Sequence, residues 1–114
     1  MPSELGYFTI PLPDIARGMK FYGALFGWTF EEPNPGYAHV NNTKPPIGLS
    51  PGQPMDFSTL YFAVTDVKAS VEQVRALGGT PGEIKEYPSG LNSLCTDDQG
   101  TKFSLWQPAP GFET

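Results

Sequence analysis

The residues of this sequence best suited to chemistry are one histidine and a few aromatic hydroxyls. His39 is the sharpest candidate, because an imidazole can gain or lose a proton near neutral pH and so act as a general base or a hydrogen-bond donor. The ordinary alternative is an exposed or hydrogen-bonded strand histidine. Tyr7 and Tyr61 could act as acids or bind a ligand. The alternative, that they are aromatic residues which only pack against their neighbours, is equally consistent with the sequence. No Asp or Glu stands at a spacing that would obviously orient the His39 ring.

The single cysteine, Cys95, and the lysine at position 102 are weaker candidates. Cys95 lies in "SLCTDD", where nearby carboxylates disfavour the thiolate, so we expect a structural rather than a nucleophilic residue. Lys102 could meet an anionic ligand, although a hairpin lysine is more often solvated. Because one cysteine cannot form an internal disulfide, we expect a cytoplasmic protein.

Two similar segments must position these residues. A constant offset aligns Asp14 with Asp66, Tyr22 with Val74 and Gly27 with Gly79. In each copy the apolar residues recur at the spacing of a helix that buries one face. The aspartates are suited to N-caps and the glycines to helix stops, so the sequence predicts two matching helices.

A strand with alternating apolar residues precedes each helix, and three further short strands follow it. The first strands place Phe8, Ile10 and Leu12 on one face, and Leu60, Phe62 and Val64 on the other copy's equivalent face. The later strands are expected in "WTFEE", "GYAHVNN" and "PPIGLS", and then in "TPGEIKE", "LNSLCTDD" and "TKFSLW". A unit of this size is marginal alone. We therefore predict one domain, residues 1–114, built from a first module of about 1–53 and a second of about 54–114.

Charge and hydropathy exclude two classes of partner. The chain of 114 residues carries a formal net charge of −5, and its few lysines and arginines are scattered, which disfavours nucleic-acid binding. No apolar run approaches the roughly 20 residues that a membrane helix needs, so we expect no membrane partner.

The two helix segments resemble a known superfamily. "IPLPDIARGMKFYGALFGWTF", "AVTDVKASVEQVRALGGTP" and "TDDQGTKFSLWQP" are similar to the vicinal oxygen chelate proteins, which include glyoxalase I, bleomycin-resistance proteins, fosfomycin-resistance enzymes and extradiol dioxygenases. The resemblance covers nearly the whole chain. It implies an α+β fold of two βαβββ modules in tandem, whose curved mixed sheets enclose a cleft, and it implies a homodimer.

The resemblance also implies four metal-ligand positions, which this sequence fills with Tyr7, Gly48, Thr59 and Ser104. Enzymes of the superfamily usually place His, Gln and Glu there. Zinc, nickel, manganese and iron favour imidazole, carboxylate or thiolate donors, whereas hydroxyls are poor ligands and glycine offers none. We therefore expect no metal and no cofactor; a cage of carboxylates for Mg or Ca is the remaining metal alternative.

Strand alternation predicts the residues that face the cleft, a mixture of aromatic walls and hydroxyls suited to a small organic molecule. The predicted ligand-binding residues are Tyr7, Thr9, Trp28, Tyr37, His39, Gly48, Thr59, Tyr61, Ser104 and Trp106. The same alternation turns Pro46, Ser50, Ser93, Cys95 and Lys102 toward the cleft, while Trp28 and Phe30 either line it or pack beneath it. The loops "EEPNPG" and "EYPSG" are expected to border it.

Four functions remain open at this point. The leading one is a metal-free protein, similar to the bleomycin-binding proteins, that binds a small organic ligand in the cleft, which we expect to be aromatic. The second is a cofactor-independent isomerase or lyase that uses His39 or Tyr7 for proton transfer. The third is a metal-dependent lyase or dioxygenase, and the fourth a non-catalytic interaction module.

Overall fold

The protein is described here by a computed structural model that covers residues 2–31 and 36–113. The chain divides into two compact units, Met1–Pro54 and Met55–Thr114, and each is described by itself. The division falls within "SPGQPMD", the Gly- and Pro-rich stretch expected to link the two modules.

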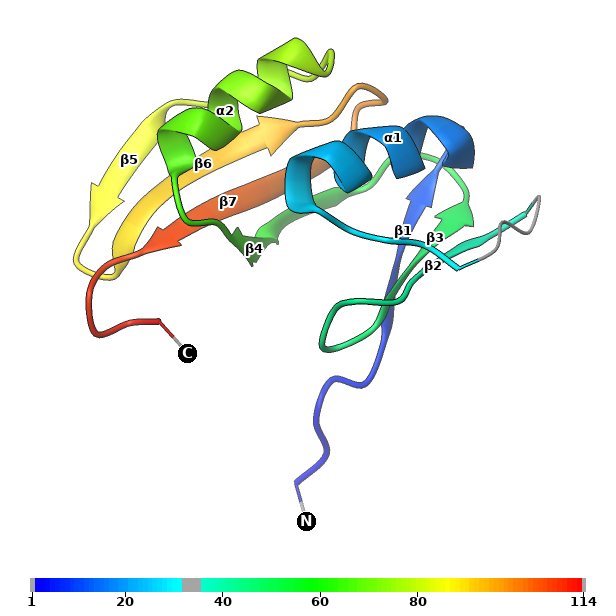
Figure 1. Cartoon of the computed structure of the whole chain (residues 1–114), viewed down its shortest axis with the longest axis horizontal. Helices are drawn as coiled ribbons and strands as arrows, with labels where there is room; N and C mark the ends of the chain where they lie inside the picture. Colours follow the sequence, from blue (N-terminus) through cyan, green and yellow to red (C-terminus); the bar gives the residue numbers. More distant parts are fainter. Residues whose placement is uncertain (1, 32–35, 114) are drawn as a thin grey trace. The chain divides into compact units, whose positions relative to one another are not determined.

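The first unit contains one helix and a mixed three-stranded sheet. Its elements are β1 (Phe8–Leu12), α1 (Ile15–Phe26), β2 (Ala38–Val40) and β3 (Ile47–Pro51). The strand order is β1-β3-β2, with β1 parallel to β3 and β2 antiparallel to it (Figure 1). The strand expected in "WTFEE" is reduced to one bridge between Phe30 and Val40. The last residue of that stretch, Glu32, and most of the "EEPNPG" loop lie outside the described residues.

The predicted signals at the ends of α1 are confirmed. The Asp14 side chain accepts a hydrogen bond from the Arg17 amide, 3.1 Å away, as an N-cap does. Gly27 ends the helix in the left-handed conformation, with φ of 70°. Between them, α1 buries Phe21, Tyr22 and Leu25 as its apolar spacing predicts.

The second unit contains one helix and a mixed four-stranded sheet. Its elements are β4 (Asp56–Ala63), α2 (Val67–Ala76), β5 (Ile84–Tyr87), β6 (Gly90–Thr96) and β7 (Lys102–Pro108). The strand order is β4-β7-β6-β5; β4 and β7 are parallel and the other pairs antiparallel. Figure 1 shows α2 lying across one face of this sheet.

One predicted helix stop moves by a residue. Asp66 caps α2 by accepting from the Ala69 amide at 3.1 Å, but the left-handed residue at the other end is Gly78, with φ of 93°, rather than Gly79. The Gly78 amide donates to the Arg75 carbonyl and the Gly79 amide to the Val74 carbonyl. This pair of bonds is a Schellman motif, which places its left-handed residue one position before the second donor.

The series of strand, helix and further strands thus occurs twice, with the first strand expected after α1 reduced to a single bridge, and the α+β architecture is confirmed. Within the described residues, no helix has both the length and the apolar character needed to cross a membrane. The cleft between the two sheets stays a prediction.

Candidate functional site

The first sheet has one face covered by α1 and one face that the helix does not cover. Ile10, Leu12 and Leu49 are almost fully buried on the helix side. Thr9 and His39 are the direct partners of Gly48 on its two sides, so all three lie on the other face. The alternation predicted for this sheet is therefore correct.

Tyr7, Tyr37 and His39 form a cluster on that face, which we call the tyrosine–histidine cluster. The Tyr7 hydroxyl is hydrogen bonded to the Tyr37 hydroxyl and lies 3.0 Å from Nδ1 of His39. The Tyr7 and His39 rings are stacked, with centroids 5.7 Å apart. Gly48 makes the cluster possible, because a Cβ there would overlap the Tyr37 hydroxyl and crowd that of Tyr7.

The surroundings of Tyr7 raise its pKa. Burial, the hydrogen bond with Tyr37, and the negative charges of ionised Tyr37 and of Glu31 raise the pKa of Tyr7 from 10.0 to about 12. At neutral pH the phenol therefore stays protonated. Tyr7 can donate a hydrogen bond there, but it is a poor acid and is not available as a base.

The second sheet likewise has a helix-covered face and an open face. Phe103 and Leu105 of β7 are buried on the α2 side, so Ser104 and Trp106, which alternate with them, belong to the open face. Across the sheet, Trp106 is paired with Asn92, and Ser104 with Leu94 on one side and Tyr61 on the other.

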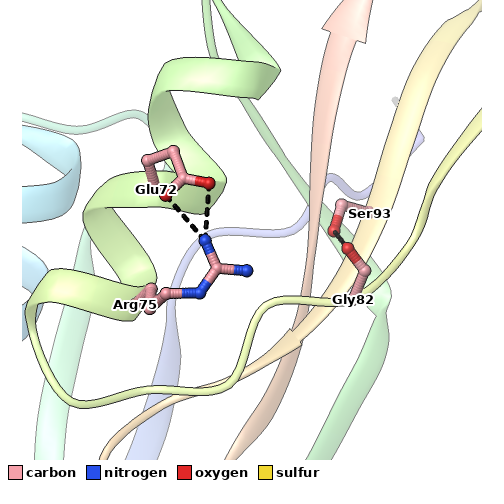
Figure 2. A network of polar contacts seen from close by, with 4 residues as sticks. All are labelled: Glu72, Arg75, Gly82 and Ser93. Atoms are coloured by element: carbon pink, nitrogen blue, oxygen red, sulfur yellow. Dashed lines mark hydrogen bonds and ion pairs between the residues drawn. The ribbon is translucent and has the colours of Figure 1, made fainter.

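This register corrects the prediction for β6. Ser93 and Cys95 were expected on the open face, but they are 1% exposed and are paired with Leu105 and Phe103 on the helix side. The Ser93 hydroxyl donates to the Gly82 carbonyl at 3.0 Å, as Figure 2 shows. The residues that sequence reasoning missed are Asn92 and Leu94, which take the open face instead.

An open pocket of about 690 Å³ lies on this unit. We call it the aromatic hollow. It is lined by Tyr61, Tyr87, Pro88, Ser89, Asn92, Trp106 and Phe112. Tyr61 is 55% exposed, Tyr87 47% and Phe112 49%, so their rings offer apolar surface that the unit does not itself cover. Tyr87, Pro88 and Ser89 come from "EYPSG", the loop that the sequence placed at the border of the site.

Trp106 is held at a fixed angle in the wall of the aromatic hollow. Its indole N–H donates to the Ser89 carbonyl at 3.1 Å, and the Ala109 amide donates to the same oxygen at 2.9 Å. Gly90, with φ of 141°, lets the β5–β6 turn come close, because a Cβ there would overlap the Gln107 carbonyl. The polar edge of the indole is thus occupied, and the ring contributes apolar surface to the pocket.

A second pocket of about 470 Å³ adjoins the first, because both are lined by Tyr61, Tyr87 and Asn92. We call it the polar hollow. Its remaining lining residues are Ser58, Glu83, Lys85, Leu94 and Ser104. The open face of the second sheet therefore passes from an aromatic region to one that carries hydroxyls and both signs of charge.

A break in the register of β4 separates Thr59 from Ser104. The pairing with β7 shifts between Phe57 and Tyr61, so Thr59 has no partner on β7 and Tyr61 stands opposite Ser104. The Ser104 hydroxyl donates to the Ser58 carbonyl at 2.6 Å, within the irregular stretch. The two hydroxyls expected as a ligand pair in this module are therefore not cross-strand neighbours.

The four positions implied for a metal do not fit one. Gly48 has no side chain, and hydroxyls of tyrosines occupy the space beside it. The Ser104 hydroxyl already donates to a carbonyl. Across residues 2–31 and 36–113, no group of three or more His, Cys, Asp and Glu side chains is placed to hold a metal ion. The donors present are not those that zinc, manganese or iron favours.

Trp28 and Lys102 lie apart from these groups. Trp28 is 8% exposed and stacks on Tyr22, with ring centroids 5.5 Å apart, so it belongs to the core of the first unit. Lys102 is exposed at the start of β7, opposite Asp56. Neither residue belongs to the groups that form the candidate site.

Comparison with known proteins agrees with the resemblance seen in the sequence. A family model described as the glyoxalase-like domain matches residues 7–106. CFP32 of Mycobacterium tuberculosis is 32% identical over 109 residues, which cover 82% of this chain and 41% of that protein. The chain thus spans less than half the length of CFP32, and the activity of the longer protein is not carried over.

Two solved structures share the fold at low identity. The antibiotic-binding protein TnmS3 from Streptomyces sp. CB03234 has a TM-score of 0.72 at 21% identity, covering 95% of this chain and 98% of its own. The bleomycin-binding protein of Streptomyces verticillus, solved with copper(II)-bleomycin, has a TM-score of 0.67 at 18% identity, covering 96% and 100%. At these identities the likeness shows the fold alone. Together with the family match, it shows that the chain belongs to the glyoxalase-like domain family of the vicinal oxygen chelate superfamily.

Proposed function

We propose that this protein binds a small aromatic organic molecule without a metal, and that the ligand is released unchanged. The observation that carries the proposal is the aromatic hollow, in which exposed rings of Tyr61, Tyr87 and Phe112 surround a fixed Trp106. Aromatic walls supply contact area and a few polar groups supply orientation, as in many small-molecule sites. The printed names of TnmS3 and of the bleomycin-binding protein support a binding role by analogy.

The donor chemistry supports the metal-free part of the proposal. The hydroxyls and the glycine at the four implied positions give a transition metal no favourable ligand set. A binding protein needs a complementary surface but no catalytic group, so these substitutions leave a binding role intact.

Fluorescence of a variant with one tryptophan tests the proposal directly. The Trp28→Phe variant leaves Trp106 as the sole tryptophan, and a screen of aromatic compounds that absorb near its emission should give saturable quenching. Chromatography with mass spectrometry of the recovered compound should return it unchanged. Tyr61→Ala should weaken the binding, whereas Lys20→Ala, on an exposed face of α1, should not. Turnover of the compound, or quenching that never saturates, would overturn the proposal.

The tyrosine–histidine cluster favours a second candidate, cofactor-independent proton transfer as in an isomerase or lyase. His39 would accept the proton, and Tyr7, which stays protonated to about pH 12, would hold the imidazole by its hydrogen bond. His39→Ala should then abolish product formation while ligand binding survives. Equal product formation by the variant and the parent protein would remove this candidate.

A further inference from the structure

Asn92 is one of three residues that line both hollows of the second sheet; the other two are Tyr61 and Tyr87. It stands in β6 between two neighbours, Trp106 on β7 and Lys85 on β5. A ligand lying on the open face of the sheet and against Trp106 would therefore meet the Asn92 amide.

Among the described residues, the side-chain carbonyl oxygen of Asn92 lacks a hydrogen-bond donor. Its Oδ1 is buried, and no hydrogen-bond donor reaches it from any part of the chain that the structure describes. A buried acceptor left unpaired is unfavourable, and a matching donor on a ligand can remove that cost. Asn92 as a residue is only partly buried, and the last torsion of an asparagine is soft, so rotation of the amide exchanges its buried oxygen with its N–H₂ group and turns the oxygen toward the pocket.

The other polar groups of the aromatic hollow are less selective. The Trp106 N–H is already bonded to the Ser89 carbonyl, so it offers a ligand nothing. The hydroxyls of Tyr61 and Tyr87 can both donate and accept, so they tolerate ligands of either kind. With its oxygen turned toward the pocket, the Asn92 amide presents a group that only accepts.

We infer that Asn92 is a specificity-determining residue, which selects aromatic ligands that carry a hydrogen-bond donor such as an amine or a hydroxyl on the ring. This inference rests on the proposed function, because it names the class of ligand that the aromatic hollow takes. A donor on the ring pairs with Oδ1 while the ring lies against Trp106. An otherwise identical ligand without the donor leaves Oδ1 unpaired.

Two probes that share one chromophore separate this inference from the proposed function. 4-Nitroaniline carries a ring amine that donates, and N,N-dimethyl-4-nitroaniline has the same ring without a donor. Both should quench Trp106 in the Trp28→Phe protein, since both present an aromatic ring. 4-Nitroaniline should bind about threefold to tenfold more tightly, as one net hydrogen bond allows.

Variants at position 92 assign the preference to this residue. Asn92→Leu should bring the two dissociation constants together, while Asn92→Asp, which keeps an acceptor, should retain the preference for the amine. Gln99→Leu removes an amide that lines neither hollow, so it should leave the ratio as it is. Taking the ratio of the two constants within one protein sample cancels any loss of folded protein in a variant.

Each outcome decides between the claims. If both probes bind the parent protein equally, or if Asn92→Leu keeps the preference, Asn92 is not the selective residue, although the aromatic hollow still binds. If the dimethyl compound binds more tightly, Asn92 does not select for a donor on the ring and the inference is overturned. If neither probe binds, the proposed function fails and the inference fails with it.

Discussion

Tyr7 stands where its phenol meets a second phenol, an imidazole and the bare backbone of Gly48. Sequence alternation placed these residues on one face, but it gave no reason for Tyr7 and Tyr37 to touch. Their contact follows from the strand order β1-β3-β2, which brings β1 and β2 to either side of the glycine.

At the residue scale, Tyr37→Phe should lower the pKa of Tyr7 from about 12 toward its ordinary value of 10.0, because the hydrogen bond and the charge of Tyr37 are lost. Burial remains, so the pKa should stop short of that value. NMR titration of labelled tyrosine checks this, with Tyr87→Phe in the second unit as the control. A Tyr7 pKa that does not move in Tyr37→Phe would show that the two phenols do not interact.

The raised pKa of Tyr7 also predicts the direction of a pH effect on stability. Between about pH 10 and pH 12 the unfolded chain has lost the Tyr7 proton and the folded chain has kept it, so the free energy of unfolding falls as pH rises. Below pH 10 the contribution of Tyr7 is fully present. Urea unfolding at a series of alkaline pH values should show a shallower fall for Tyr37→Phe than for the parent protein; parallel curves would contradict this.

Gly48→Ala tests the space that holds the tyrosine–histidine cluster. The new Cβ would overlap the Tyr37 hydroxyl, the end of a side chain that can swing outward, so the free energy of unfolding should fall by about 1 kcal/mol, the low end of the cost of overpacking. The stacking of Tyr7 on His39 should be lost, and the pKa of Tyr7 should fall. NMR shifts of the His39 ring report the first effect. Unchanged His39 shifts would mean that the cluster does not depend on the glycine.

At the scale of the elements, the caps of both helices follow from local sequence, but the exact stop of α2 does not. Two adjacent glycines satisfy the same sequence signal. Which of them takes the left-handed conformation depends on where the last helical carbonyls find donors, and here the donors select Gly78.

Gly78→Ala and Gly79→Ala form a matched pair for this point. Gly78 has φ of 93°, where a Cβ is strained, so its substitution should reduce the free energy of unfolding by about 1–2 kcal/mol. Gly79 has no positive φ, so its substitution should cost much less. Urea denaturation followed by Trp106 fluorescence in the Trp28→Phe background measures both. Equal losses from the two variants would contradict the assigned helix stop.

At the scale of the whole molecule, the sequence predicts a homodimer that needs no metal. The donor set supports the absence of a metal requirement, so ligand binding should be unchanged after dialysis against EDTA and after addition of zinc or manganese. Calorimetric titration with an aromatic ligand measures this. Loss of binding in EDTA that returns with the metal would revive a lyase or dioxygenase function.

Native mass spectrometry of the purified protein measures the assembly at the same time. A dimer mass without metal would agree with the prediction, and a small retained compound would identify the ligand class. A monomer alone would contradict the dimer, and one metal per site would contradict the reading of the four ligand positions.

The sequence by itself determined the repeat, the two helices with their aspartate caps, and the alternation of β1 and β7. These features depend on local sequence. An N-cap needs only residues within one helical turn, and apolar residues at alternate positions of a strand indicate which face is buried. The resemblance to the superfamily could also be recognised from the sequence, because the motifs that carry it lie within the repeated segments.

Tertiary structure alone decided which residues form the candidate site. In β6, Leu91 and Leu94 point to opposite faces, so neither face of the strand is clearly more apolar than the other in the sequence. Only the pairing with β7 shows that Asn92 lies on the open face. The shift in β4 that separates Thr59 from Ser104 is likewise set by the partner strand. Period-two patterning shows which residues share a face, but contacts with other strands and with the helix decide which face is left open.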